Sequence, residues 1–291
     1  MRVWAGEEII FQKNIEQIDS ITFVELNTPQ LIDEGTLVGE FSVAIDKKVH
    51  FSQGNLQYQR ATNTWRFANN QYDFIGEGNS NITDNQYQGW IDSFGWGTGT
   101  APILYTANDQ TYSAFYDWGS NKISNGGNMP NVWSTLARSE WVYIFHERPF
   151  AETLFAFGSV NDVPGLIILP DEWSLPDGPT FNTAAQQGLE WKISSSSGVD
   201  LSYYNGTGEL YTSNSYNIDE WKKMEIAGAV FLPAAGHRHV SQVDAVGTNG
   251  VYWSSTARSY EDAFNLLFNP NQIWPQLCYN RHYGLSVRLV R

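Results

Sequence analysis

Gly-Leu-Ser-Val-Arg-Leu-Val-Arg, at residues 284–291, is the most informative stretch of the chain. Three apolar residues at alternate positions would share one face of an extended strand, whereas Ser286 and Arg288 would share the other. This alternation predicts a half-buried strand. Tyr-Trp-Ser-Ser at residues 252–255 opens the same region of the chain. We predict that Trp253 is a core residue because it lies within a strand pattern.

The residues between these two stretches divide into a strand and a connection. Residues 263–269 have a strand pattern, whereas residues 270–280 contain the prolines and asparagines that are typical of turns. Arg281 and Arg288 are interpreted as structural donors that hold loops. Four aromatic side chains in or beside the turn-rich stretch would be unusual in a core, so we expect them at the surface: Trp274, Tyr279, His282 and Tyr283.

Two helices are predicted upstream. Ser139 suits the N-cap of a helix over residues 139–146, and the acidic residue that follows it suits the positive end of the helix dipole. In residues 217–224 apolar side chains recur at helical spacing. The chain therefore combines helices with many short strands.

The first 39 residues differ in sequence pattern from the rest. Residues 3–11 and 20–25 look like two short strands, too small to build a core of their own. Residues 27–39 predict a linker. We therefore predict an N-terminal β arm and linker over residues 1–39 and one folded domain over residues 40–291.

Within the folded domain, short strand patterns alternate with long loops. Residues 41–45 and 49–51 look half-buried, and residues 68–100 have little periodicity. Two similar apolar runs, at residues 165–170 and 228–233, each end in proline. They are either an internal repeat or two buried strands of similar composition.

The composition is that of a globular protein, with 42% hydrophobic and 16% charged residues. Aromatic residues make up 15% of the chain, so we expect some aromatic rings to be exposed as contact groups. The net charge of −14 would repel nucleic-acid phosphates and anionic lipid headgroups. We therefore expect no nucleic-acid partner. No stretch approaches eighteen apolar residues, so we expect no membrane insertion either.

Cys278 is the only cysteine, which excludes an intramolecular disulfide and a multi-cysteine metal site. It is interpreted as a small apolar contact residue rather than a reactive thiol. His237 and His239 could place two rings on one face of a strand, but no third ligand has suitable spacing. We therefore expect no metal and no cofactor, although a structural ion held by loop carbonyls would leave no motif.

Recognisable catalytic motifs are missing from the sequence, including serine-nucleophile motifs, HExxH, phosphate-binding loops and dinucleotide fingerprints. Asp171 with Glu172, and Asp219 with Glu220, are interpreted as solvated helix starts rather than acid–base pairs. The chain is therefore not expected to be an enzyme.

Several short stretches occur in an order that is specific as a set: FSQGNLQY at 51–58, FGWG at 94–97, ISNGG at 123–127, EWVY at 140–143, FLPAAG at 231–236, YWSS at 252–255 and NR at 280–281 before the closing stretch. With them, residues 40–291 resemble the C-type-lectin-fold proteins common in gut Bacteroidetes and their phages. Some of those proteins are the variable proteins of diversity-generating retroelements.

The resemblance implies an α+β C-type lectin fold: a small twisted antiparallel sheet, two helices, long ordered loops and a binding face built from the last strands. In retroelement members, copying errors at adenines, chiefly in asparagine codons, change surface positions and leave the scaffold fixed. Residues matching the scaffold are Tyr252, Trp253, Ser254, Ala263, Phe268, Pro275, Gln276, Asn280, Arg281 and Gly284 onward.

Residues that match the changeable set form a variable region within residues 252–291. They are Ala257, Arg258, Ser259, Tyr260, Asp262, Phe264, Leu277, Cys278, Tyr279, His282 and Tyr283, to which Trp274 is added as a ligand contact. Glu261 and Trp274 depart from the pattern, since neither arises from an asparagine codon changed at adenines alone. Formylglycine-generating enzymes share this fold but use paired cysteines, and calcium-dependent lectins use Glu-Pro-Asn or Gln-Pro-Asp motifs that are missing here.

The leading hypothesis is a non-catalytic binding protein or adhesin that presents a diversifiable surface to a protein or a surface glycan. It would act outside the cell, on a bacterial surface or on a phage virion, although residues 1–6 do not read as a signal peptide. The first alternative is a lectin of fixed specificity for a glycan. The second is a hydrolase that uses loop carboxylates.

Overall fold

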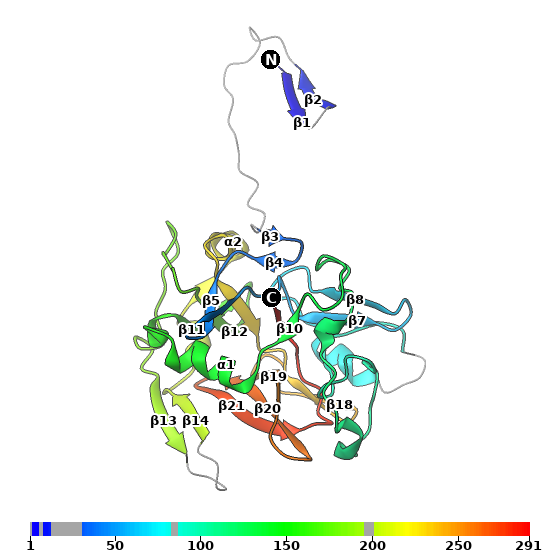
Figure 1. The fold of residues 1–291 in the computed structure, drawn as a ribbon. Helices are drawn as coiled ribbons and strands as arrows, with labels where there is room; N and C mark the ends of the chain where they lie inside the picture. The colour runs from blue at the N-terminus through cyan, green and yellow to red at the C-terminus, as the bar shows by residue number, and fades with distance from the viewer. Residues whose placement is uncertain (1, 6–7, 13–30, 83–86, 195–200) are drawn as a thin grey trace.

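The computed structural model describes residues 2–5, 8–12, 31–82, 87–194 and 201–291 (Figure 1). The protein is α+β, with mostly β-structure, two α-helices and several small sheets whose strands are nearly all antiparallel. The predicted class is therefore confirmed at this level.

The largest sheet has five strands in the order β13-β14-β21-β20-β19. All its pairings are antiparallel. Its strands are β13 (Glu190–Ser194), β14 (Leu201–Asn205), β19 (Gly250–Ala257), β20 (Asp262–Asn269) and β21 (Gln272–Asn280). The strand predicted at residues 263–269 is therefore confirmed, but the turn-rich connection predicted at 270–280 is wrong. A tight turn at 270–271 leaves the rest of that stretch to β21, because pairing with β20 outweighs its prolines and asparagines.

A second sheet of four strands has the order β15-β11-β12-β16. Its strands are β11 (Phe155–Val160), β12 (Val163–Ile168), β15 (Ser215–Tyr216) and β16 (Val230–Pro233). The two similar apolar runs noted in the sequence become β12 and β16, which pair antiparallel with Leu166 opposite Leu232. Their similarity is that of neighbouring buried strands.

The remaining strands form one three-stranded sheet and five two-stranded ribbons. The three-stranded sheet contains β7 (Leu56–Gln59), β8 (Thr64–Phe67) and β9 (Trp90–Ile91). The ribbons pair β1 (Arg2–Ala5) with β2 (Glu8–Gln12), β3 (Leu31–Asp33) with β4 (Thr36–Leu37), β5 (Phe41–Ala44) with β6 (Lys47–Val49), β10 (Ser134–Thr135) with β22 (Leu289–Val290), and β17 (His237–His239) with β18 (Gln242–Asp244).

The N-terminal predictions are corrected in two places. Residues 3–11 are not one strand but the β1–β2 hairpin, with Val3 opposite Phe11. Part of the predicted linker at residues 27–39 is the β3–β4 hairpin, and Leu37 there is buried in the main core. The strand predicted at residues 20–25 lies outside the described residues.

Both predicted helices are present. α2 (Ile218–Ile226) begins with a full capping box, in which Asn217 Oδ1 accepts the Glu220 N–H at 3.0 Å and the Glu220 carboxylate accepts the Asn217 N–H at 3.0 Å. The prediction that Asp219 and Glu220 start a helix is therefore confirmed. Asp171, in contrast, lies in a turn and accepts hydrogen bonds from Ser42, so its predicted helix start is wrong.

α1 (Arg138–Val142) continues into a π-helical turn, Tyr143–Glu147. Its N-cap is Ala137, so the N-cap predicted at Ser139 is wrong. Thr256 Oγ1 on β19 accepts the Arg138 N–H at 3.0 Å, so a neighbouring strand supplies the acceptor that a local cap would provide. Among the described residues, no helix combines the length and apolar character needed to cross a bilayer.

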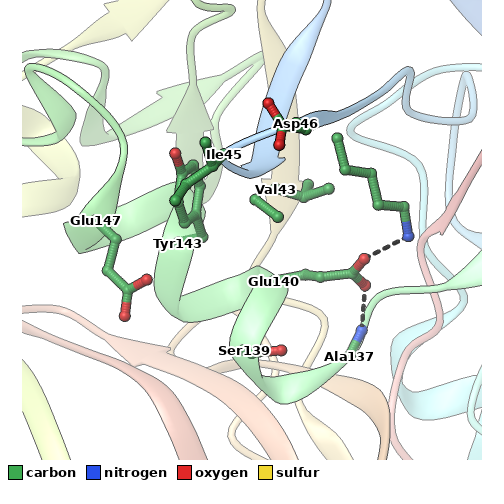
Figure 2. A pocket seen from close by; sticks show the side chains of 10 residues that line it. Val43, Ile45, Asp46, Ala137, Ser139, Glu140, Tyr143 and Glu147 are labelled. Atoms are coloured by element: carbon green, nitrogen blue, oxygen red, sulfur yellow. Dashed lines mark hydrogen bonds and ion pairs between the residues drawn. The ribbon is translucent and has the colours of Figure 1, made fainter.

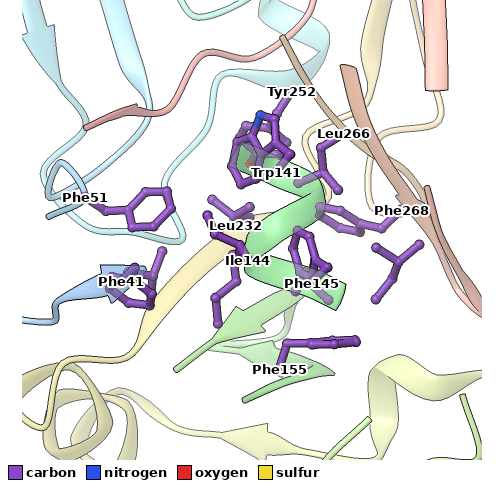
Figure 3. Packing of buried hydrophobic residues seen from close by; sticks show 14 of the residues in the cluster. Phe41, Phe51, Trp141, Ile144, Phe145, Phe155, Leu232, Tyr252, Leu266 and Phe268 are labelled. Atoms are coloured by element: carbon purple, nitrogen blue, oxygen red, sulfur yellow. The ribbon is translucent and has the colours of Figure 1, made fainter. Parts of the chain in front are cut away.

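The five-stranded sheet separates two hydrophobic cores. One face packs with α1 and the four-stranded sheet, where Trp141, Phe145 and Phe268 meet (Figure 3). On its other face, Trp253 and Leu267 pack with residues of the three-stranded sheet and of the long loops. A smaller cluster lies under α2. Since β19 and β20 are buried on both faces, their positions are fixed by packing from two sides. The prediction that Trp253 is a core residue is confirmed.

The closing stretch, residues 284–290, is buried on both faces, so the predicted half-buried strand is wrong. Ser286 N donates to Val251 O at 3.0 Å on one side, and Val287 O accepts the Leu56 N–H at 2.9 Å on the other. The polar residues of the stretch are as buried as the apolar ones, with Arg288 only 1% exposed.

Arg288 is accommodated by a buried polar network. Its Nη2 donates to Gln71 Oε1 at 2.7 Å, and Gln71 Nε2 donates to Glu225 at 2.8 Å. Its Nη1 donates to Asn55 Oδ1 at 3.4 Å, and Asn55 Nδ2 donates to the Tyr252 hydroxyl at 3.2 Å. Burial lowers the pKa of Arg288 to about 10, so the guanidinium stays charged near neutral pH. The interpretation of Arg288 as a structural donor is confirmed.

Substitution of Arg288 with methionine is predicted to destabilise the fold by ~3–5 kcal/mol, because the buried polar groups of Gln71, Asn55 and Glu225 lose their positively charged partner. Urea unfolding followed by tryptophan fluorescence measures this change. Lys192→Met serves as the control, because it removes an ion pair between exposed side chains. A urea midpoint of the Arg288→Met variant equal to that of the control would contradict the assignment of Arg288 as a structural donor.

Candidate functional site

The sequence-predicted contact residues and scaffold residues separate by burial. Of the twelve predicted contact residues, only Phe264 is buried; the others are exposed or half-buried. Of the scaffold residues through Val290, only Asn280 is not buried. We call the eleven accessible contact residues the terminal surface: Ala257, Arg258, Ser259, Tyr260, Asp262, Trp274, Leu277, Cys278, Tyr279, His282 and Tyr283.

Five of these side chains meet in one hollow of about 350 Å³. It lies where β20 begins and β21 ends, and we call it the terminal hollow. Its lining residues are His237, Arg258, Asp262, Cys278, Tyr279, Asn280 and Tyr283. The sequence did not identify His237 or Asn280 as contacts, since His237 comes from a distant strand and Asn280 was assigned to the scaffold.

Four of the lining residues of the terminal hollow are bonded to one another. Arg258 Nη1 lies 3.4 Å from the Asp262 carboxylate and donates to Cys278 Sγ at 3.0 Å. Asn280 Nδ2 donates to Asp262 Oδ1 at 2.8 Å. The hollow is thus preorganised and contains one positive and one negative side chain.

Arg281 lies beneath this region and holds it in place. Its guanidinium donates to the carbonyls of Tyr112, Ser113, Ser259 and Asp262, and it stacks 4.4 Å from the Trp96 ring centre. All four acceptors are backbone atoms, so Arg281 joins the β19–β20 turn to a distant loop. Its interpretation as a structural donor is confirmed.

Histidine and tyrosine rings form a cluster on one side of the hollow. Tyr283 lies between His237, at 5.9 Å and nearly parallel, and His239, at 4.6 Å between ring centres. Both histidines lie on β17, with the intervening Arg238 buried, which confirms that their rings share a face. The Asp109 carboxylate, 2.7 Å from His282 Nδ1, orients His282. No sequence pattern linked Asp109 to this region.

Trp274 lies near the start of β21 and does not line the hollow. Its ring stacks on that of Tyr203 from β14, with centres 3.8 Å apart and an interplanar angle of 5°. Both residues are half-buried. Phe264, the buried member of the predicted set, lies under the Arg138 guanidinium at 4.5 Å and is not part of the terminal surface.

A larger hollow, of about 600 Å³, lies between the β5–β6 turn and α1 (Figure 2). Ile45 on its rim is 86% exposed. Its Glu140 carboxylate is already engaged by Lys47 and by the Ala137 N–H. No lining residue belongs to residues 252–291, so this hollow is separate from the terminal surface.

The chemistry available at the terminal surface is hydrogen bonding, stacking and apolar contact. Within the described ranges, no three His, Cys, Asp or Glu residues are placed to hold a metal ion. Burial raises the pKa of the Cys278 thiol above its ordinary value near 9, although Arg258 acts in the opposite direction. A thiol that is neutral at pH 7 is a poor nucleophile, which supports the interpretation of Cys278 as a contact residue.

Alkylation of Cys278 by iodoacetamide is predicted to be slower than that of free cysteine at pH 8, because less of it is thiolate. The rate should keep rising with pH beyond 9. Mass spectrometry of the quenched protein measures the modified fraction at each pH. A midpoint at or below that of free cysteine would contradict the raised pKa.

Comparisons with family models, with curated proteins and with solved structures found no match to this chain. Its function is therefore inferred from its own residues. They provide a surface of accessible aromatic and polar side chains on a scaffold that is buried on both sides of the sheet.

Proposed function

We propose that this protein is a non-catalytic binding protein on a C-type-lectin scaffold, and that the terminal surface contacts a protein or a surface glycan. The observation that carries the proposal is the agreement between burial and the division of residues 252–291 into scaffold and contact positions. That division came from a resemblance in sequence, to which Trp274 was added as a ligand contact. Ten of the eleven contact positions from the resemblance are accessible, as is Trp274, which supports a surface that tolerates change.

The support beneath the surface suits this role. A diversifiable site requires a framework whose stability does not depend on the exposed side chains. Trp253 and Arg281 provide such a framework, because their polar atoms bond to backbone carbonyls: Trp253 Nε1 donates to Phe94 O at 2.7 Å. Replacement of a side chain at the surface therefore leaves these bonds intact.

Trp274 and Glu261 remain exceptions to the codon pattern, and their positions are informative. Trp274 stacks on Tyr203, which lies outside residues 252–291, so it has a fixed structural partner. Glu261 is exposed in the β19–β20 turn and contributes its backbone carbonyl to the Arg281 N–H at 2.9 Å. We infer that Trp274 is constant while its neighbours vary, whereas the backbone bond at Glu261 does not depend on its side chain.

The second candidate is a lectin of fixed specificity, favoured by the parallel Trp274–Tyr203 pair. Flat aromatic faces can pack against the C–H face of a sugar ring, and the bonded Asp262–Asn280 pair beyond them offers polar partners. In either case we propose a location outside the cell, on a bacterial surface or a phage particle.

Substitution of the terminal surface is predicted to leave the fold intact. A library that varies its residues other than Trp274 should be displayed on yeast at near wild-type level, since all are accessible and only Leu277, Tyr279 and Tyr283 pack against a core cluster. The matched library varies ten buried positions of the same strands: Val251, Tyr252, Trp253, Ser254, Ala263, Leu266, Leu267, Phe268, Ile273 and Gln276. Flow cytometry after a conformation-sensitive protease step measures the displayed fraction of each library. An equal loss of display in both libraries would contradict the proposal.

The joint substitution Trp274→Ala and Tyr279→Ala is predicted to abolish ligand binding. Glycan arrays and a panel of bacterial surface proteins provide the probes, and Tyr116→Ala, an exposed tyrosine elsewhere, is the control. Loss of glycan signal alone favours the fixed lectin. Loss of protein binding favours the diversifiable receptor, and binding that survives the double substitution places the site elsewhere.

A further inference from the structure

Strand β21 is longer than the neighbour that covers its outer edge. β14 pairs with β21 at Tyr204 opposite Ile273 and at Asn205 opposite Gln272. Two residues farther along β21 is Pro275, which has no N–H to donate to a neighbouring strand. From Gln276 to Asn280, β21 pairs with β20 on its inner side, and no described strand pairs with its outer side.

The hydrogen bonds of β20 show which way the peptide groups of Cys278 point. Phe264 is opposite Cys278, but its carbonyl accepts a bond at 2.8 Å from the Ser254 hydroxyl on β19. Asp262 is opposite Asn280, and its carbonyl accepts the Arg258 N–H at 3.0 Å. Since hydrogen-bonded and non-hydrogen-bonded pairs alternate in antiparallel strands, the N–H and C=O of Cys278 point away from β20.

We propose that the outer edge of β21, centred on Cys278, binds an extended peptide segment of a protein ligand as an added β-strand. The peptide groups of Cys278 offer a donor and an acceptor, and neither the strand pairings of β21 nor the other backbone bonds among the described residues give them a partner. An added strand supplies the complementary pair and takes its register from it. This inference rests on the proposed binding function and specifies the ligand class.

The terminal hollow explains how such an edge would select its ligand. Alternate side chains of an added strand point to one face of the sheet, and the hollow of about 350 Å³ adjoins the edge at Cys278, Tyr279 and Asn280. The half-buried rings of Tyr279 and Tyr283 favour an apolar or aromatic side chain there.

Charge restricts the ligand further. The Arg258–Asp262 pair leaves the hollow without net charge, whereas the whole chain carries −14. A neutral or basic segment is therefore favoured over an acidic one. A glycan has no row of amide groups and cannot satisfy the edge in this way.

Selection of random twelve-residue peptides by mRNA display on the full chain carrying Cys278→Ala tests the proposal, and the alanine prevents capture through the thiol. Selected peptides should bind the Cys278→Pro chain at least about tenfold more weakly, because proline removes the outward N–H without breaking the β20 ladder. Circular dichroism and the melting temperature establish that both chains are folded.

Two further measurements apply to the Cys278→Ala chain alone and decide the question if the proline variant fails to fold. N-methylation along a bound peptide should weaken binding at every second residue, and exchange of the residue 278 amide should slow on binding. Three outcomes would each overturn strand addition: equal affinity of the peptides for the folded Cys278→Pro chain and the Cys278→Ala chain, equal tolerance of N-methylation at every peptide residue, or failure to enrich any peptide.

The failure of this inference can be distinguished from that of the proposed function. Peptides that lose affinity on Tyr279→Ala but not on Cys278→Pro would leave the terminal surface as the binding site and remove only this inference. Indifference to both substitutions would remove both proposals.

Discussion

The structure depends on one buried cation. Arg288 is buried, and its guanidinium donates to Asn55 and Gln71, which in turn donate to Tyr252 on β19 and Glu225 on α2. Desolvation of a charge is costly unless its donors find acceptors, and here Nη1 and Nη2 have acceptors whereas Nε has none among the described residues, so these partners must assemble together. The closing stretch is consequently a central element rather than an edge strand.

This arrangement positions the terminal surface. The β19–β20 pair is fixed by cores on both faces, and Arg281 anchors the adjoining turn through backbone carbonyls. The accessible side chains therefore project from a support whose main contacts are buried beneath them. Asp109, His237 and His239, all distant in sequence, complete the surroundings of the surface through contacts with His282 and Tyr283.

The α+β class and both helices were predictable, because apolar spacing is a local signal, whereas the division of residues 252–291 came from the resemblance in sequence. The burial of Arg288 was not, since alternation cannot distinguish a solvent-facing arginine from one that meets Gln71 across the fold. The cap of α1 was missed because Thr256 supplies its acceptor from another strand. His237 joined the terminal hollow through tertiary contact alone, which no spacing rule detects.

The distance along the chain between the partners of Arg288 also constrains how the protein folds. Asn55 and Arg288 are separated by 233 residues, and Gln71 and Arg288 by 217. During synthesis, the upstream strands that receive residues 284–290 must wait for that stretch to emerge. Such high contact order slows folding and leaves apolar strands exposed meanwhile. The same connection that stabilises the finished molecule thus slows the folding of its nascent chain.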